Sequence, residues 1–576
     1  MNTNTSYWII WALAVMVLTL GLVFPPLMDY DAAQIGTISM SMYQRNDWLT
    51  ILNRHYVGGS WYDYLDKPHL VYWSAMAGYK IFGLGHVGMR FFSVLSTLVA
   101  AYGIAKLGSR LYNKEVGRWA SLIFVTSQAI MLANHDVRTD ALLTSFTLLS
   151  IWQLVVFVDT RKWLPLVAGF LFLALAVASK GLIAAVVAGS AIFFYLMGKK
   201  DWQGIFNWKW PAAILIFLAG LSPFLYAYYL QFDMHPEKFV NGSYGNSGVK
   251  FLLWSHSVDR FSGNRNLVAS PEFSFFFHTI LWAFLPWTVL LATGVFSRGK
   301  ELWKTRFASF FSREQLSFAG VWAIFILMSF AKFKLPHYLN ILFPMMSIFS
   351  AAWLWQLREN GQSKTIRQLF RVQKGIITIL MAALIIIIVW SFPLKSPWVA
   401  FGIAGFCALL WQFWRVEGGM ADRLVLLTAT AALLLNFVLN THFYPAIGKY
   451  QGGSTMAGLI KEKGIDTGSV YLYGKVVRSL DFYTQRFTPV IDSAGIFEEL
   501  SKGRTLRLYT TDNSGDTLRM QYPGATAVIT TPNQKITRLK FSFFNPAKRE
   551  EGMPKAVLYE LRPEGIPQRI DNIQEK

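Results

Sequence analysis

Ionisable residues interrupt an otherwise apolar sequence in five short clusters, and their types suit chemistry at a phosphate. The clusters occupy residues 28–34, 64–73, 134–140, 256–261 and 332–338. A carboxylate can accept the proton of an attacking hydroxyl group, and Lys or Arg can neutralise the charge of a phosphate. The combination of acids and bases therefore indicates transfer of a group away from a lipid phosphate.

The first cluster places Asp29 and Asp31 just after an apolar stretch near the N-terminus. An acid in the first turn of a helix complements the helix dipole, which is the structural explanation for either residue. The functional explanation is a catalytic base or a metal ligand.

The second cluster centres on Lys67, between Asp66 and Pro68. The proline fits the first turn of a helix, and residues 71–73 (Val-Tyr-Trp) predict an interfacial, amphipathic character for it. Lys67 then lies at the water–lipid boundary, where it either extends toward headgroups or holds a lipid phosphate.

The third cluster contains Asp136 and Asp140, which are four residues apart and share a helix face. Asp140 lies at or inside the next apolar span, where an ionisable side chain is costly and is by default functional. Pairing of Asp140 with Arg138 or Lys180 is the structural alternative.

The last two clusters add a histidine and further cations. His256 and Arg260 project together if their segment is helical, although a lone histidine is more often structural than a ligand. Lys332 and Lys334, followed by Tyr338, lie in a short connection between two apolar stretches. Two lysines there suggest a bound anion, and exposure to water is the alternative.

Apolar stretches must position these clusters. The chain of 576 residues is 53% hydrophobic and only 15% charged, against about 25% charged in an average soluble protein. A membrane helix needs roughly 20 apolar residues, and this length predicts about thirteen spans. They lie near residues 8–26, 87–107, 115–133, 139–158, 163–179, 182–197, 210–230, 275–296, 316–331, 338–357, 375–392, 398–414 and 424–443.

The distribution of positive charge predicts the orientation. Lys and Arg are concentrated in alternate short connections, which predicts a cytoplasmic N-terminus. The net charge of +21 is then largely topological and argues against nucleic acid as a partner. All five clusters fall on the outer side, where segments 27–86 and 231–274 are long. The single cysteine, Cys407, excludes an internal disulfide.

The sequence changes character near residue 445. Residues 1–444 are predicted to form the transmembrane domain, and residues 445–576 a small extracytoplasmic α/β domain. Predicted strands are 470–473, 506–509 and 527–529, and predicted helices are 456–463 and 495–502.

The clusters resemble the motifs of a known family, the polytopic GT-C glycosyltransferases related to protein O-mannosyltransferases, and most closely the lipid A aminoarabinose transferases. Asp31-Ala32-Ala33-Gln34-Ile35-Gly36 stands where that family has Asp-Glu-Ala-x-Tyr-Ala. Residues 64–73 match its Tyr-Phe-Glu-Lys-Pro-Pro-Leu-x-Tyr-Trp motif. Asp140, the 334–338 stretch and Pro286-Trp287 match an acid after the third helix, a Lys-Leu-Pro-x-Tyr motif and a Pro-Trp pair.

The resemblance implies a multi-pass inner-membrane enzyme that moves a sugar, with inversion, from a polyprenyl-phosphate donor to a lipid A, glycan or protein acceptor on the outer face. It implies Asp31 as the base and Asp140 as a catalytic support. Lys67 is expected to hold the donor phosphate, with Arg260, Lys334 and Tyr338. Asp29 and Asp136 are expected to have supporting roles.

Two departures from the family motifs limit the inference. Ala32 replaces a glutamate, and Asp66 replaces the glutamate before the lysine. Some family members bind a divalent metal near the latter position. Asp66 and His256 together would supply two ligands, which do not make a firm metal site.

A transporter or flippase of a lipid-linked or anionic substrate is the alternative function. Transporters usually place their polar sites near the bilayer midplane, between two related halves. Here the acids gather on one face and the sequence shows no repeat, so the enzyme is favoured.

Overall fold

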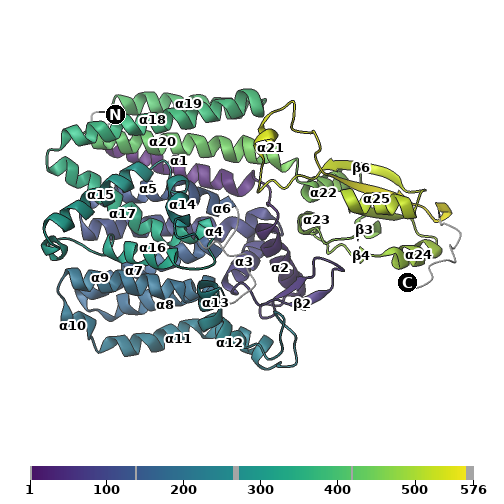
Figure 1. Ribbon diagram of the computed structural model, residues 1–576, viewed down its shortest axis with the longest axis horizontal. Coiled ribbons are helices and arrows are strands. Elements are labelled where there is room, and N and C mark those ends of the chain that lie inside the picture. The colour runs from purple at the N-terminus through teal and green to yellow at the C-terminus, as the bar shows by residue number, and fades with distance from the viewer. Residues whose placement is uncertain (1–2, 136–138, 264–271, 417–418, 566–576) are drawn as a thin grey trace.

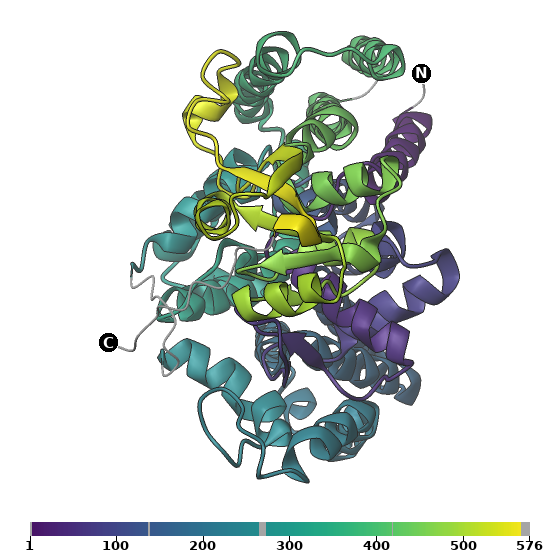
Figure 2. The same cartoon turned by 90° about the vertical axis from the view of Figure 1, so that its right-hand side faces the viewer.

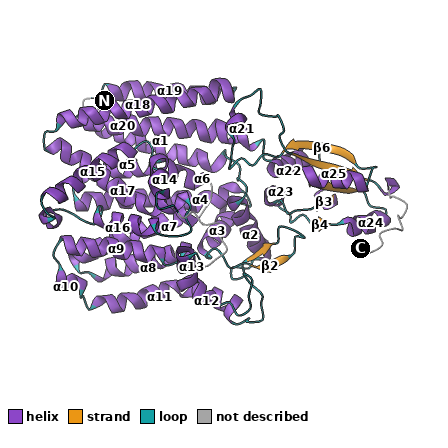
Figure 3. Cartoon of the chain, viewed as in Figure 1, coloured by secondary structure: helices purple, strands orange, loops and turns teal. Residues whose placement is uncertain are grey.

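The computed structural model describes residues 3–135, 139–263, 272–416 and 419–565. Long helices lie side by side in one bundle, and a smaller domain that carries a sheet lies at one end of it (Figure 1, Figure 3). Viewed from that end, the small domain covers the middle of the bundle (Figure 2).

The bundle is built from helices whose composition suits a membrane. Within the described residues, nine helical segments are long and apolar enough to cross one, and ten if the bent pair α5–α6 counts as one span. The principal helices are α1 (Thr3–Val23), α4 (His86–Leu111), α5 (Lys114–Val125), α6 (Gln128–His135), α7 (Thr139–Thr160), α8 (Trp163–Lys180), α9 (Ile183–Gly198), α11 (Lys209–Tyr228), α14 (Phe275–Ala283), α15 (Thr288–Lys304), α16 (Ala319–Ser329), α17 (Phe343–Glu359), α18 (Ser363–Ile385), α19 (Pro397–Trp414) and α20 (Met420–Val438).

The polytopic helical fold predicted from the sequence is confirmed, whereas the total of about thirteen spans stays a prediction. Each predicted stretch contains a helix, but α9 and α16 are short for a span. The stretch at 275–296 is divided into α14 and α15 around Pro286, which has no backbone N–H to donate and cannot continue a helix. Helix α6 is bent by 58° from α5.

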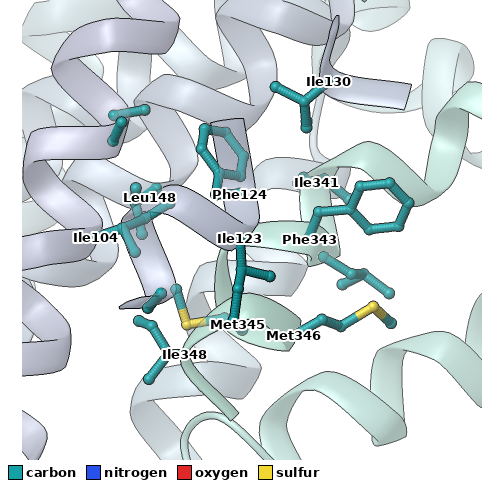
Figure 4. Close-up of a cluster of buried hydrophobic side chains, with 14 of the residues drawn as sticks. Ile104, Ile123, Phe124, Ile130, Leu148, Ile341, Phe343, Met345, Met346 and Ile348 are labelled. Carbon is teal, nitrogen blue, oxygen red and sulfur yellow. The ribbon is translucent and has the colours of Figure 1, made fainter. Parts of the chain in front are cut away.

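Apolar side chains from sequence-distant helices fill the centre of the bundle (Figure 4). Ile104, Phe124 and Leu148 come from α4, α5 and α7, and they meet Met345 and Ile348 of α17. All five are buried. Close packing of this kind holds the helix ends in fixed positions.

Two shorter helices, α2 (Asp31–Arg45) and α3 (Leu70–Phe82), lie at the end of the bundle nearest the small domain (Figure 1). A Cβ atom at Gly78 of α3 would lie 1.9 Å from the carbonyl oxygen of Gly88 in α4, so only glycine permits this approach. The buried Arg90 of α4 donates hydrogen bonds to the carbonyls of Pro25 and Pro26. These bonds fix the chain between α1 and α2.

The segments between the bundle helices contain further short elements. Strands β1 (Leu52–Arg54) and β2 (Trp61–Asp63) form an antiparallel hairpin between α2 and α3. The remaining helices are α10 (Trp202–Ile205), α12 (Gly248–Lys250), α13 (His256–Ser262) and α21 (Tyr444–Gly448), with a 3₁₀ turn, η4 (Pro336–Leu342), ahead of α17.

The small domain is a five-stranded mixed sheet of order β4-β3-β5-β7-β6. Strand β3 is parallel to β4 and β5, whereas β7 is antiparallel to β5 and β6. The predicted small α/β domain is therefore present. Its elements are α22 (Gly452–Glu462), β3 (Val470–Tyr473), α23 (Arg478–Thr484), β4 (Val490–Ile491), α24 (Ser493–Ser501), β5 (Leu506–Thr511), α25 (Asp512–Gln521), β6 (Thr526–Pro532) and β7 (Lys555–Leu561).

Buried polar contacts join the small domain to the bundle. Arg54 of β1 forms an ion pair with Asp481 of α23, with 2.7 Å between Nη1 and Oδ2 and both side chains buried. The guanidinium of Arg478 lies 4.8 Å from the ring centroid of Tyr30. The small domain is thus attached directly beside the chain that enters α2.

Candidate active site

Asp31 and Lys67 form the first charged pair of the site. Asp31 begins α2, and Lys67 lies three residues before α3, with 3.6 Å between its Nζ and Oδ1 of Asp31. The positive end of the α2 dipole also attracts the carboxylate. The Asp31 side chain is 40% exposed, so a substrate can reach it.

Asp140, Lys180 and His337 form the second charged group. Asp140 lies in the first turn of α7 and Lys180 ends α8, so the antiparallel packing of α7 and α8 brings them together. Lys180 Nζ lies 2.6 Å from Asp140 Oδ1, and His337 Nε2 lies 3.7 Å from Oδ2. The pairing of Asp140 with Lys180, the structural alternative considered from the sequence, is confirmed.

Both charged groups line one cavity with a volume of about 260 Å³. Two groups that line the same space can act on one bound molecule. The other polar or aromatic side chains that line it are Tyr30, Gln34, Asp66, Thr139, His256, Phe333 and Tyr338.

An apolar pocket of about 110 Å³ adjoins this cavity. Leu143, Ile183, Phe276, Leu327 and Met328 contribute to its walls, and it shares Lys180, His256, Phe333 and Tyr338 with the charged cavity. Lys180 Nζ lies 4.2 Å from the Tyr338 ring centroid, a cation–π contact. A cation therefore stands where an apolar pocket meets a polar one.

A larger cavity, of about 750 Å³, adjoins the charged cavity and shares Tyr30, Asp31, Asp140, Leu335 and His337 with it. Its other walls include Trp282 and Asn340 of the bundle and Lys535, Thr537 and Arg538 of the small domain. The two carboxylates consequently lie where the two polar cavities meet.

Most of the residues singled out from the sequence converge on this site. Asp31, Asp140, Lys67 and Tyr338 line the charged cavity, and so do Asp66 and His256. Asp136 lies outside the described residues, and so does the side chain of Arg260, whose backbone belongs to α13.

Asp29 and Lys334 are used elsewhere. Asp29 accepts a hydrogen bond from Ser479 Oγ (2.6 Å), and its backbone N–H donates to Gln451 Oε1. Burial raises the pKa of Asp29, and both partners belong to the C-terminal region. Lys334 Nζ donates to the carbonyl oxygen of Glu272 (3.0 Å), and neither residue lines the charged cavity.

Within the described ranges, the metal site predicted at Asp66 and His256 has no third protein ligand. Asp66 and His256 line the same cavity, but Asp66 accepts a hydrogen bond from Tyr64 Oη. Among the described residues, no group of three or more His, Cys, Asp or Glu side chains is arranged to hold a metal ion. Two side chains are fewer ligands than a zinc site uses, and no step of the reaction is assigned to a metal.

The helix expected after Lys67 is α3, which has one buried and one more exposed side. Val71 and Tyr72 of α3 are fully buried and pack against α2. The buried face of α3 therefore packs on α2, and its interfacial position stays a prediction.

Two functional candidates were not identified from the sequence. His337 lies within the fifth cluster, but nothing in the local pattern showed that it approaches Asp140. Lys180 was considered only as an ion-pair partner, and its place between the apolar and charged cavities depends on the packing of α7 against both α8 and η4.

Comparison with known proteins identifies a family model and several similar sequences. The family model for dolichyl-phosphate-mannose-protein mannosyltransferases matches residues 66–227. Undecaprenyl phosphate-alpha-4-amino-4-deoxy-L-arabinose arabinosyl transferases of Edwardsiella ictaluri and Pseudomonas fluorescens are 24% and 25% identical, over 65% and 61% of this chain. An uncharacterised protein of Aquifex aeolicus is 27% identical over 50% of this chain. These matches cover 62%, 60% and 53% of the relatives' own lengths, respectively.

Solved structures extend the likeness to nearly the whole fold. ArnT from Cupriavidus metallidurans bound to undecaprenyl phosphate has a TM-score of 0.70 and 18% identity, and the match covers 97% of this chain and 99% of that one. Its apo structure gives a TM-score of 0.68. The resemblance drawn from the motifs is therefore confirmed: this chain is a multi-pass membrane protein with the GT-C fold of ArnT, similar in sequence to the aminoarabinose transferases.

Proposed function

We propose that this protein is an inverting membrane glycosyltransferase that moves a sugar from a polyprenyl-phosphate donor to an envelope acceptor. The proposal rests on three adjoining cavities that share lining residues. An apolar pocket joins a cavity that contains Lys67 and Lys180, and that cavity joins a larger one at Asp31 and Asp140. A lipid tail, a phosphate-linked sugar and an acceptor can occupy them in that order.

The donor occupies the first two spaces. Its isoprenoid chain lies along the apolar pocket, whose burial from water is favourable. Its phosphate lies where the apolar and charged cavities share Lys180 and Tyr338, within reach of Lys67. These cations stabilise the negative charge that develops on the phosphate as the sugar leaves.

The acceptor approaches from the larger cavity. Asp31 accepts the proton of the acceptor's attacking group as this group forms a bond to the anomeric carbon of the sugar. The bond from that carbon to the phosphate oxygen breaks, and its electron pair leaves with the polyprenyl phosphate. Attack from the side opposite the phosphate inverts the anomeric centre. Asp140 is held by Lys180 and His337 and supports the acceptor or the base.

The names of the related transferases suggest undecaprenyl phosphate as the carrier and an aminoarabinose as the sugar. The acceptor is lipid A, another envelope glycan or a protein. Mass spectrometry of envelope lipids and glycoproteins from a deletion strain would identify it.

We place the reaction on the outer face of the inner membrane. The distribution of Lys and Arg supports a cytoplasmic N-terminus. In this orientation the small domain, at residues 445–576, is extracytoplasmic.

Two substitutions test the roles. Asp31→Asn should lower transfer of a labelled sugar from its undecaprenyl phosphate donor by about 10²- to 10⁴-fold, the usual contribution of a general base, with no change in folding. Lys67→Ala should weaken binding of undecaprenyl phosphate roughly 10-fold or more. Lys332→Ala is the matched control, since this exposed lysine does not line the charged cavity. Normal turnover by Asp31→Asn would refute the base assignment.

A further inference from the structure

The connection between β6 and β7, residues 533–554, returns from the sheet to the rim of the bundle beside α21 (Figure 1). Ile536 and Phe543 are buried there in one apolar cluster with Phe392 and Tyr444. The guanidinium of Arg549 lies 3.8 Å from the Phe392 ring centroid. The 533–554 segment is therefore anchored on the membrane domain.

Anchoring Ile536 turns its neighbours toward the larger cavity. Lys535, Thr537 and Arg538 are exposed, and all three line that cavity together with Asp31 and Asp140. In the parts of the chain that the structure describes, neither Lys535 nor Arg538 makes an ion pair or a side-chain hydrogen bond.

Asp31 and Asp140, the acids that line the larger cavity, form ion pairs with other lysines. Asp31 has Lys67 at 3.6 Å, and Asp140 has Lys180 at 2.6 Å. Lys535 and Arg538 therefore contribute positive charge that the cavity wall does not neutralise. Such charge in a concave site concentrates anions, and guanidinium groups bind phosphates and carboxylates with two parallel hydrogen bonds.

Building on the proposed function, we propose that Lys535 and Arg538 bind an anionic group of the acceptor, a phosphate or a carboxylate. The cavity volume of about 750 Å³ lies within the range of sites that enclose sizeable ligands. The small domain then forms one wall of the acceptor site and selects acceptors by their charge. This wall distinguishes anionic from neutral acceptors and does not select the sugar.

Direct binding tests the proposal without any donor. The full-length protein in phosphatidylcholine nanodiscs is titrated with a fluorescent bis-phosphorylated disaccharide lipid (lipid A) and with the same lipid after phosphatase treatment. Wild type should prefer the phosphorylated form. The K535A/R538A variant should bind it roughly tenfold more weakly and should lose the preference. K540A/K548A is the control, because it removes equal charge from the same segment outside the cavity lining.

Three outcomes would overturn the proposal. One is equal binding, or no binding, of both lipid forms by wild type, and another is an unchanged affinity in K535A/R538A. The third is loss of the preference when phosphatidylglycerol is added to the nanodiscs, which would assign the cations to bulk headgroups. Titration of each variant with undecaprenyl phosphate gives an independent check. A wild type that fails to bind this carrier refutes the proposed function, whereas normal carrier binding without lipid discrimination refutes only the inference.

Discussion

The buried pair of Asp140 and Lys180 allows the structural and catalytic parts of the site to be separated. The two charges are 2.6 Å apart, and their side chains are 2% and 10% exposed. At an effective dielectric constant of about 20, they attract each other by roughly 6 kcal/mol. Desolvation offsets most of this energy, so the pair as a whole adds little to the free energy of unfolding.

Breaking the pair from one side should be far more costly than removing it. Lys180→Met leaves the Asp140 carboxylate buried without its ion pair to Lys180, and Asp140→Asn leaves the Lys180 ammonium buried without that pair. Each single variant should lose about 3–5 kcal/mol. The double variant Asp140→Asn/Lys180→Met should regain most of that loss, because no buried charge remains.

Thermal unfolding of the purified protein in detergent, with transfer activity measured on the same samples, gives both readouts. The pair of Lys199 and Asp159, 2.7 Å apart with side chains 44% and 17% exposed, is more accessible to water and is the control. Lys199→Met should change the free energy of unfolding by about 1 kcal/mol or less. A coupling energy between Asp140 and Lys180 below about 0.5 kcal/mol would refute the electrostatic reasoning. A double variant with normal stability and normal transfer would show that Asp140 is structural only.

Three further substitutions separate attachment of the small domain from catalysis. Asp29→Asn should keep the rate of sugar transfer within about threefold of wild type. An amide oxygen can still accept the hydrogen bond from Ser479, and burial already disfavours the charged carboxylate. A loss of about 100-fold or more in transfer assays would instead indicate a catalytic role for Asp29. Lys334→Met should leave undecaprenyl phosphate affinity unchanged in a titration, since its ammonium binds the Glu272 carbonyl; weaker binding would place it at the phosphate. Arg54→Met should destabilise the small domain by about 3–5 kcal/mol and increase its proteolysis, because Asp481 loses its buried partner; an unchanged proteolysis rate would contradict this.

The membrane fold was largely predictable because it depends on length and composition. Apolar stretches located the helices, and alternation in the C-terminal region located β3, β5 and β6. Strand β7 was not predicted, since charged Lys555 and Glu560 interrupt its apolar pattern. The bend between α5 and α6 was also missed, as it follows from packing of the two helices in the bundle.

The candidate site was predictable from the sequence for residues whose position next to a helix end indicated a role. Asp31 and Lys67 each open or precede a helix at the rim, and the structure places them 3.6 Å apart. Asp29 differs from Asp31 by two positions, yet it binds Ser479, which is 450 residues away. No local pattern distinguishes these two acids, because the difference depends on where the small domain docks.

The position of the small domain on the bundle also helps to distinguish an enzyme from a transporter. A transporter needs a route that opens alternately to the two sides of the membrane. Here the charged cavity is built from the first turns of α2 and α7 and the last turn of α8, which lie at one end of the bundle. The polar pocket around Arg298 of α15 and Glu314, at the opposite end of the bundle, has a volume of about 20 Å³.

The small domain also covers the one end where a transported substrate would leave. Arg478 lies over Tyr30, which lines both polar cavities, and Arg54 and Asp481 hold the domain in place with a buried ion pair. Release through this end would require these contacts to break in every cycle, at a cost of several kcal/mol. A group-transfer enzyme has no such requirement, because donor and acceptor can both enter from the membrane side and react where the two cavities meet.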